Sequence, residues 1–498
     1  MVAQEAINII IDIEKNVEVD EIEFKGIKVW PLIRLQIWKH LTNTYSGNKA
    51  EEAKKTSSKK YTIKYFVSKL TILFIYVTHY LFNRQIIEEK DVVFLSSPNN
   101  RWERVDGKYF RPFSNSLQDI LKQMDLKSII FDTSPIKMSP IYGEPIFIKD
   151  ELEIKSAVYR MLDFLKRPKE IIHWDSLIKF INRRYPDQLL LSEQSIKDMA
   201  NNVIFCSKIF KSKLEQIKPK IGFLVCFYTP VSMAYIKACR DLGIKTVEIQ
   251  HSQQNLNGMY APWIKLPKNG YSLLPSYWWC WGIRPAENIN AWSKNVYPEH
   301  RALVGGNPWL AKNLVGDYKI DYPNISEFNK KFSTEKIKVL VAMQPIEPLL
   351  PDNLLEVLRH SPKNVNWFFR LHPAIKARED EIRNIINKTQ NKNVELDHSS
   401  KMPLFNLLKK VDFLITAWSG VAYEALIFGV HPIIIHPEGK NAFKEYIGIK
   451  LFTYASSPQE IINTLKFNKK DFTFKEDTPY METNIEKMKR LISDLLSA

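Results

Sequence analysis

Short apolar runs alternate with longer segments of helical periodicity along most of the chain. After residue 90, the first series of apolar runs is Val92–Leu95, Ser128–Phe131, Ile221–Cys226, Thr246–Ile249 and Trp278–Trp281. Segments of helical spacing, such as Ser232–Asp241, separate these runs. Continuous apolar runs of this kind are typical of parallel strands that helices cover on both faces. The pattern therefore predicts a parallel α/β sheet, with a helical insertion over residues 151–218.

A second series of apolar runs follows Gly305-Gly306-Asn307-Pro308 and a polar stretch over residues 317–335. Its members are Lys338–Met343, Asn366–Leu371, Val394–Leu396, Asp412–Thr416 and His431–His436. Glycine, proline and polar residues between two such series are typical of a hinge between domains. The sequence therefore predicts two Rossmann-like domains, one over residues 91–315 and the other over residues 316–480.

Both ends of the chain show helical periodicity. Residues 1–90 form a predicted helical region, and residues 481–498 a predicted amphipathic helix. Within the first region, Leu70–Asn83 lacks formally charged residues but is shorter than the ~18–20 residues that a membrane-spanning helix needs. Basic residues flank it: Lys59, Lys60, Lys64, Lys69 and Arg84. This pattern is typical of a helix at a membrane interface, and a buried core helix is the alternative.

Composition narrows the class of partner. The chain has 498 residues and a formal net charge of +16, which favours anionic partners. A membrane surface fits better than nucleic acid, because no zinc-finger or RNP-like motif is present. The four cysteines, which have no C-x-x-C spacing, indicate a reducing compartment. The first residues lack the pattern of a signal peptide. We therefore expect a cytoplasmic protein, peripheral on the inner membrane surface, without a nucleic-acid partner.

Candidate chemistry lies where strands of the second domain are predicted to end. Arg370-Leu371-His372 closes one apolar run, and Lys376 follows four residues after the histidine. Arg370 and Lys376 can neutralise a diphosphate, and His372 can donate to a phosphate oxygen. As structural alternatives, Arg370 could pair only with a surface carboxylate, and His372 could satisfy only a turn carbonyl.

The neighbouring apolar run ends in a predicted strand-to-helix turn. Ser419 and Gly420 lie where a helix N-terminus presents backbone N–H groups, an environment that suits a diphosphate. Glu424 follows one turn later, within reach of a ribose. As structural alternatives, Ser419 is a preferred helix cap and Glu424 a first-turn acid. A further segment, His436-Pro437-Glu438-Gly439, follows the next predicted strand and is a weaker candidate for contact with the donor.

These motifs carry a family resemblance. His372-Pro373 with Lys376, the Ser419 turn, and the E-A-L-x-x-G-x-x-P passage from Glu424 to Pro432 resemble the donor domain of GT-B glycosyltransferases. The resemblance covers residues 335–440. It extends to bacterial capsule and lipopolysaccharide transferases, including Kdo- and sialic-acid-type enzymes, and to CDP-glycerol glycerophosphotransferases. It implies a GT-B fold, in which two Rossmann-like domains face a cleft, and a nucleotide-sugar donor.

The acceptor side is expected in the first domain. Glu248-Ile249-Gln250-His251-Ser252 ends a predicted strand, and His251 resembles the histidine of the Q-H-G segment in the glycerophosphotransferases, with Ser252 in place of glycine. A group that titrates near neutral pH suits removal of a hydroxyl proton, so His251 is the predicted base and Glu248 the reserve. Arg101 and Arg104 are candidates for binding an anionic acceptor, or simply residues of a solvated loop.

The predicted function is transfer of a sugar from a nucleotide-sugar to a surface polysaccharide or lipid-linked glycan. No Asp-x-Asp triplet, P-loop or G-x-G-x-x-G motif is present, so we expect no metal and no cofactor beyond the donor substrate. Three alternatives stay open: transfer of a polyol phosphate from a CDP-alditol, a UDP-sugar 2-epimerase-like reaction, and a non-catalytic GT-B scaffold.

Overall fold

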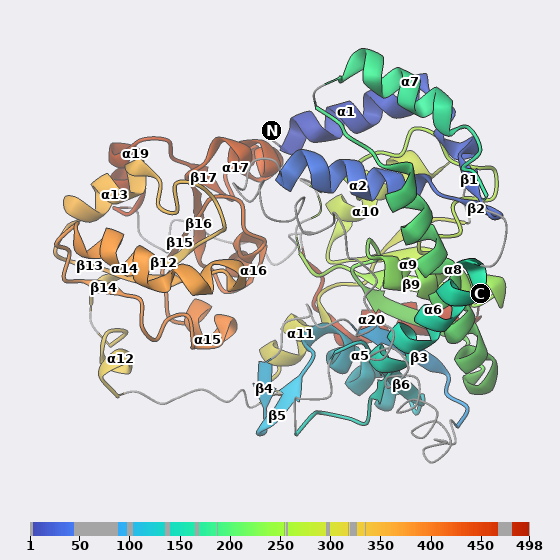
Figure 1. Ribbon diagram of the computed structural model, residues 1–498. Helices are drawn as coiled ribbons and strands as arrows, with labels where there is room; N and C mark the ends of the chain where they lie inside the picture. Colours follow the sequence, from blue (N-terminus) through green and yellow to red (C-terminus); the bar gives the residue numbers. More distant parts are fainter. Residues whose placement is uncertain are drawn as a thin grey trace, which may run out of the picture. The chain divides into compact units, whose positions relative to one another are not determined.

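The computed structural model describes residues 3–43, 88–96, 103–134, 140–164, 169–186, 188–252, 254, 257–294, 299–316, 318, 326–333, 335–466 and 481–497. These residues form two compact units (Figure 1). Unit 1 comprises Met1–Trp102, Lys108–Trp309 and Glu482–Ala498, and unit 2 comprises Glu103–Gly107 and Leu310–Met481. Unit 1 therefore receives its last segment after the chain has passed through unit 2.

The described strands of unit 1 form a seven-stranded parallel sheet in the order β11-β10-β9-β8-β3-β6-β7. Their bounds are β3 (Val92–Ser96), β6 (Ser128–Asp132), β7 (Ile146–Phe147), β8 (Ile221–Val225), β9 (Lys245–Ile249), β10 (Tyr277–Cys280) and β11 (Arg301–Val304). The chain builds this sheet outward from β3, first through β6 and β7 and then, on the other side, through β8 to β11. The order reverses between β3 and β8, as in doubly wound Rossmann-like domains.

Helices surround the sheet of unit 1. They are α5 (Pro112–Lys122), α6 (Lys149–Phe164), α7 (Trp174–Arg184), α8 (Glu193–Ile217), α9 (Pro230–Asp241) and α10 (Ile283–Ser293), with α11 (Pro308–Leu314) at the sequence boundary of the units. Apolar residues of α8 and α9 share one buried cluster with Val93, Leu95 and Phe131 of the sheet. Helix α5 contacts β6 and β8 from outside that cluster. A two-stranded sheet of β4 (Glu103–Val105) and β5 (Lys108–Phe110) precedes α5.

The segment nearest the N-terminus is part of the core of unit 1. Its elements are α1 (Ala3–Asn16), η1 (Val19–Glu21), β1 (Glu23–Phe24), β2 (Ile27–Lys28) and α2 (Trp30–Asn43). Pro31 lies in the first turn of α2, where its missing N–H leaves no intrahelical bond unmade. Side chains of both helices, including Ile10 and Leu32, are fully buried in the same apolar cluster as α8 and α9. These two helices are therefore structural elements of the Rossmann-like domain.

Helix α20 (Ile485–Ser497) also belongs to unit 1 and contacts α5. The segment before it is joined to the end of the sheet, because Glu482 donates its N–H to the carbonyl of Trp281 (2.7 Å) and accepts from the Asn307 N–H (2.9 Å). Gly306 lies against this segment with a φ of +80°, and a Cβ there would come 2.2 Å from the Glu482 carbonyl oxygen. Only glycine fits this position.

The described strands of unit 2 form a six-stranded parallel sheet in the order β14-β13-β12-β15-β16-β17. Their bounds are β12 (Ile337–Ala342), β13 (Val365–Arg370), β14 (Val394–Glu395), β15 (Phe413–Thr416), β16 (His431–Ile434) and β17 (Thr453–Tyr454). The first strand, β12, lies between β13 and β15, so the order reverses between β12 and β15. This is again the doubly wound arrangement.

The helices of unit 2 are short. They are α12 (Ser326–Lys330), α13 (Asp352–Arg359), η3 (Pro373–Arg378), α14 (Glu379–Asn387), α15 (Leu404–Leu408), α16 (Val421–Ile427), α17 (Pro437–Ala442), α18 (Lys444–Gly448) and α19 (Pro458–Thr464). Residues of α13, α14 and α19 pack with alternate residues of the central strands, such as Val341 and Phe369, in one apolar cluster.

The predicted α/β fold class, with two Rossmann-like parallel-sheet domains and helices near the N-terminus, is confirmed. Each apolar run that the sequence analysis singled out is a strand, and Glu151–Lys218 is largely helical. Leu70–Asn83 and its flanking basic residues lie outside the described residues. Among the residues that the structure describes, no helix is both long and apolar enough to cross a membrane.

Candidate functional site

The carboxyl ends of β12 and β15 flank the point where the strand order of unit 2 reverses. In open α/β sheets this is the edge at which ligands bind, because the loops that follow the two strands diverge there. Gln344 follows β12, and Trp418, Ser419 and Gly420 follow β15. The donor-side motif that the sequence predicted on Ser419 and Gly420 therefore lies at this position.

Most backbone N–H groups of the turn after β15 are already engaged within unit 2. Trp418 donates to the side-chain oxygen of Gln344 (2.6 Å), and Ser419 donates to the Thr416 hydroxyl (3.3 Å). Val421 donates to the Ser419 hydroxyl (3.3 Å), but the N-cap residue of α16 is Gly420 and not Ser419, the residue that the structural alternative named. The N–H of Gly420 has no acceptor among the described residues. The turn is thus held by side chains and leaves the Gly420 amide for a ligand oxygen.

Glu424 lies in α16, one turn beyond this amide. Only 9% of the residue is exposed. Helix α16 has seven residues, so the contribution of its dipole is small, and the fixed N–H of Gly420 is the stronger feature of the turn.

The second donor-side motif follows β13, which is the neighbour of β12 on the far side from β15. Arg370 is half-buried and donates to the carbonyl oxygens of Ser399 (3.2 Å) and Met402, so its guanidinium holds the loop before α15. His372 is half-buried and caps η3, because its Nδ1 accepts the Ala374 N–H (3.2 Å). Lys376 is exposed on η3. Of these three residues, Lys376 is the most accessible to an anion in solution.

An aromatic pair completes this edge of the sheet. His436 follows β16, and its ring lies 4.7 Å from the ring of Trp418 at an interplanar angle of 63°. Its Nδ1 accepts the Glu438 N–H (3.2 Å) at the start of α17, and burial lowers the pKa of His436. A neutral imidazole next to an indole offers an apolar surface of the kind that a nucleobase or a sugar ring contacts.

In unit 1 the predicted catalytic pair lies at the carboxyl end of β9. Glu248 is fully buried and accepts from the hydroxyl of Tyr260 and from the Phe227 N–H (3.2 Å). Its second carboxyl oxygen has no hydrogen-bond partner among the described residues. Burial raises the pKa of Glu248 to about 8, although the Tyr260 hydroxyl and the backbone N–H groups of Phe227 and Cys226 lower it. The carboxyl group is therefore mainly protonated at neutral pH.

His251 lies in the loop that follows β9 and is half-buried, with its ring 6.4 Å from that of Tyr228. The buried Gln250 side chain fixes this loop. It donates to the Ser252 carbonyl (3.0 Å) and accepts the Trp281 N–H (2.7 Å). His251 is therefore held between two anchored neighbours.

The acceptor-side candidates are only partly described. Arg101 lies outside the described residues. Arg104 is exposed on β4, in a segment that groups with unit 2 rather than with the sheet of unit 1. The aromatic run around Trp279 belongs to the core, because Trp278, Trp279 and Cys280 are buried.

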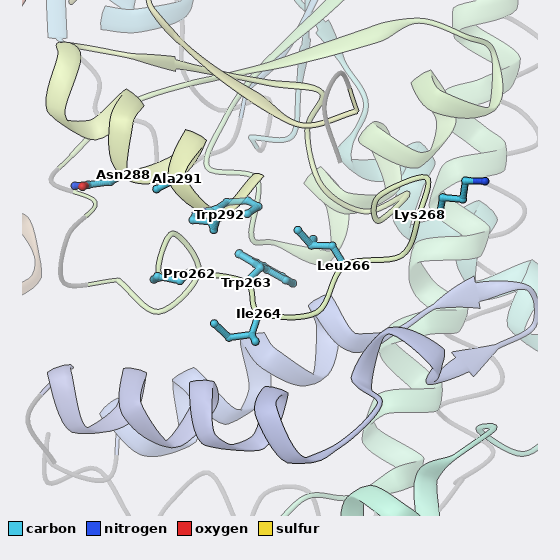
Figure 2. Close-up of a pocket in the computed structure, with 8 residues that line it drawn as sticks. All are labelled: Pro262, Trp263, Ile264, Leu266, Lys268, Asn288, Ala291 and Trp292. Atoms are coloured by element: carbon cyan, nitrogen blue, oxygen red, sulfur yellow. The ribbon is translucent and has the colours of Figure 1, made fainter. Parts of the chain in front are cut away.

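A separate cavity of about 460 Å³ lies in unit 1 beside helix α10 (Figure 2). It is lined by Pro262, Trp263, Ile264, Leu266, Lys268, Asn288, Ala291 and Trp292. None of the predicted site residues contributes to its wall.

Sequence reasoning missed the residues that fix the two sites. Gln344 was detectable only as a polar residue just after an apolar run. Tyr260 gave no signal, because its contact with Glu248 depends on how the loop after β9 returns to the sheet.

No family model matches the chain, and no curated protein matches it in sequence. Similar solved structures include UDP-GlcNAc 2-epimerase from Neisseria meningitidis bound to UDP-GlcNAc, with a TM-score of 0.46 and 15% identity over 82% of this chain and 99% of that one. The S. aureus MnaA–UDP structure has a TM-score of 0.47 and 13% identity, covering 82% and 98%. MurG of Acinetobacter baumannii has a TM-score of 0.39 and 10% identity, covering 82% and 99%.

Proposed function

We propose that the chain is an enzyme acting on a nucleotide-sugar and that unit 2 binds the nucleotide. The observation that carries this proposal is the turn after β15, where Gln344, Thr416 and Ser419 take the neighbouring amides and leave the Gly420 N–H at the reversal of the strand order. A diphosphate oxygen is the expected acceptor there. Glu424 would accept from the ribose hydroxyls, and Arg370, His372 and Lys376 would supply positive charge and a donor for the phosphates.

More specifically, we propose a metal-independent glycosyltransferase. The acceptor hydroxyl oxygen forms a bond to the anomeric carbon while the bond from that carbon to the phosphate oxygen breaks. The electron pair leaves with the nucleotide, whose added charge the donor-side residues stabilise. The acceptor proton goes to His251. We assign the base to His251 rather than to Glu248, because a carboxyl group with a pKa of about 8 is already protonated at neutral pH.

A 2-epimerase-like reaction is the second candidate. The observation that favours it is the same Glu248, since a carboxyl group that is protonated at neutral pH suits proton donation to a sugar carbon or to a leaving oxygen. A polyol-phosphate transfer would use the same nucleotide site, whereas a non-catalytic scaffold would keep its function when the phosphate-site residues are replaced.

The nucleotide proposal is tested by thermal-shift and calorimetric screening of CMP, CDP, UDP, GDP and their sugars. A ligand that binds only the folded chain raises its apparent stability by mass action. Binding by none of these nucleotides would contradict the proposal. The sugar nucleotide that binds is then incubated with and without glycan acceptors. Turnover that needs an acceptor supports a transferase, and rearrangement of the donor alone supports an epimerase.

For the acceptor we propose a surface polysaccharide or a lipid-linked glycan, with the chain peripheral on the cytoplasmic face of the membrane. The support is the net charge of +16 and the uncharged run Leu70–Asn83 between basic residues.

A further inference from the structure

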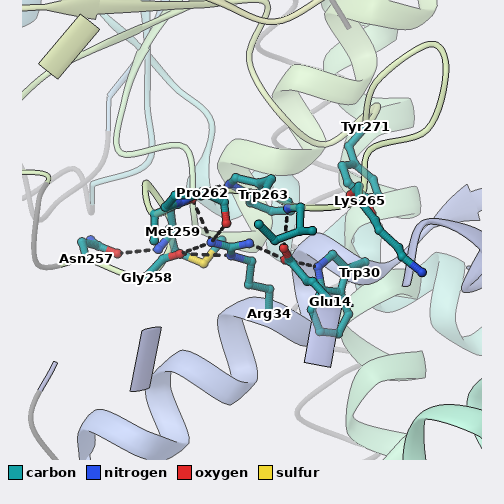
Figure 3. A network of polar contacts seen from close by, with 12 residues as sticks. Glu14, Trp30, Arg34, Asn257, Gly258, Met259, Pro262, Trp263, Lys265 and Tyr271 are labelled. Carbon is teal, nitrogen blue, oxygen red and sulfur yellow. Dashed lines mark hydrogen bonds and ion pairs between the residues drawn. The ribbon is translucent and has the colours of Figure 1, made fainter. Parts of the chain in front are cut away.

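A fully buried arginine joins the N-terminal helices to the loop that carries Tyr260. Arg34 of α2 forms an ion pair with Glu14 of α1, and Glu14 also accepts from the Trp30 indole N–H (2.7 Å) (Figure 3). The guanidinium lies 4.1 Å from the ring centroid of Trp263. Removing a guanidinium from water is costly, so its burial requires that its donors find well-placed acceptors.

Those acceptors are backbone carbonyls on both sides of Tyr260. Arg34 donates to the carbonyl of Gly258 from Nε (3.0 Å) and Nη2 (2.7 Å), and from Nη2 to the carbonyls of Ala261 (2.9 Å) and Pro262 (3.2 Å). Glu14 accepts the Ile264 N–H (2.7 Å) with its second oxygen. One ion pair therefore fixes residues 258–264 at several points, as Figure 3 shows.

The same segment also packs closely against α2. A Cβ on Gly258 would lie 2.4 Å from the Trp38 ring, so the backbone at this position touches the helix directly. Tyr260 is 6% exposed, and its ring packs edge-on against Phe227 (5.5 Å) and Tyr228 (5.7 Å). Its hydroxyl donates to Glu248. The flanking carbonyls and the ring contacts therefore hold Tyr260 with its hydroxyl on Glu248.

We propose that Arg34 and Glu14 are positioning residues that hold the Tyr260 hydroxyl on the Glu248 carboxyl group. The N-terminal helices would thereby set the protonation of Glu248 without contacting it. A catalytic consequence rests on the role that Glu248 has in the second candidate function, whereas the coupling itself does not. If Arg34 served stability alone, its replacement would weaken the fold and leave the titration of Glu248 unchanged.

The test is an infrared pH titration of the protonated-carboxyl band, with Glu248→Gln as the blank and no substrate present. Tyr260→Phe removes a donor to the carboxylate, so the Glu248 midpoint should rise by about one to two pH units. Arg34→Lys keeps the positive charge but loses the planar fork of donors, so the midpoint should rise in the same direction. The double variant should rise no further than Tyr260→Phe alone, because both changes remove the same hydrogen bond.

Arg111→Lys is the matched control. Arg111 forms another buried arginine–carboxylate pair of unit 1, with Asp132. Arg111→Lys should lower the stability of the fold without changing the pH midpoint of the Glu248 titration. An unchanged midpoint in folded Arg34→Lys, or additive shifts in the double variant, would overturn the proposal. If Arg34→Lys does not fold, Gly258→Ala displaces the same segment from Trp38 and carries the same expectation. Shifted midpoints in a chain without transferase or epimerase activity would reject the proposed function alone.

Discussion

The side-chain oxygen of Gln344 accepts the backbone N–H of Trp418 at 2.6 Å and so joins the ends of β12 and β15. The same oxygen lies 3.4 Å from the Thr416 hydroxyl, which in turn accepts the Ser419 N–H. A single amide side chain therefore shapes the turn that precedes Gly420. This relationship makes the proposed nucleotide site testable apart from the residues that would contact a ligand.

Gln344→Ala should weaken nucleotide binding about tenfold while the chain stays folded. The variant removes the acceptor of a partly buried N–H, a loss of about 1–2 kcal/mol, and frees the turn to move. Calorimetry with the nucleotide from the screen measures the effect, and circular dichroism reports on the fold. Wild-type affinity in this variant would show that the turn does not bind the nucleotide.

Gly420→Pro should abolish nucleotide binding, whereas Gly420→Ala should retain it. The φ of Gly420 is −58°, which both residues accept, and proline is tolerated at the start of a helix. The two variants thus differ in whether residue 420 has an N–H group. Equal nucleotide affinities of the two variants would show that the Gly420 amide does not bind the nucleotide.

His372→Ala and Glu424→Ala should each lower the nucleotide affinity in the same assay.

His251→Ala should keep nucleotide affinity but lose transfer by about 10²–10⁴-fold, the usual contribution of a general base. The variant removes the proton acceptor and leaves unit 2 unchanged. Acceptor-dependent turnover and calorimetry are measured on the same preparation. Near-wild-type turnover would assign the proton transfer elsewhere, with Glu248→Gln as the next variant to assay.

Acid should destabilise both units through buried histidines. His300 in unit 1 and His431 in unit 2 are almost fully buried, and burial lowers the pKa of each to about 4. The unfolded value is about 6.5, so between these values the unfolded chain binds more protons, and stability is lost as pH falls. Each histidine should cost about 2 kcal/mol between pH 7 and pH 5. Urea unfolding of His431→Asn should show a smaller loss of stability for unit 2 over this interval, and an equal loss would contradict the prediction.

The chain should sediment with anionic liposomes at low salt and be released at high salt. Each basic residue near a membrane surface contributes on the order of 1 kcal/mol, and salt screens this attraction. Charge reversal of Lys59, Lys60, Lys64 and Lys69 should weaken binding, with neutral liposomes as the control. A chain that stays in the supernatant at low salt would leave an acidic glycan as the partner that the net charge of +16 favours.

The central strands could be predicted because helices bury them on both faces, which leaves continuous apolar runs in the sequence. Lys338–Met343 and Asn366–Leu371, for example, lie within one residue of β12 and β13. Among the edge strands, β14 was predicted as Val394–Leu396, whereas β7, β11 and β17 could not be predicted, because they are short or partly exposed. Strand β17 has only two residues, and β11 begins with an exposed arginine.

The turn at Ser419 and Gly420 was also predictable, because a strand that ends in small residues before a helix has few other conformations. The residues that fix this turn could not be predicted, since Gln344 is 74 positions away from Trp418 in the sequence. The protonation of Glu248 depends on burial, and the contact between Arg34 and Gly258 spans 224 positions. Local patterns contain no information about such contacts.

The hydrogen bonds of Glu482 to Trp281 and Asn307 have a consequence for the order in which the chain folds on the ribosome. Unit 1 needs residues 482–497, which are synthesised after the whole of unit 2. Its sheet can form earlier, but the end at Gly306 stays uncovered until translation reaches these residues. Unit 2 does not depend on a later segment, because Leu310–Met481 is complete before Glu482 is added. The later domain in the sequence should therefore be the first to finish folding.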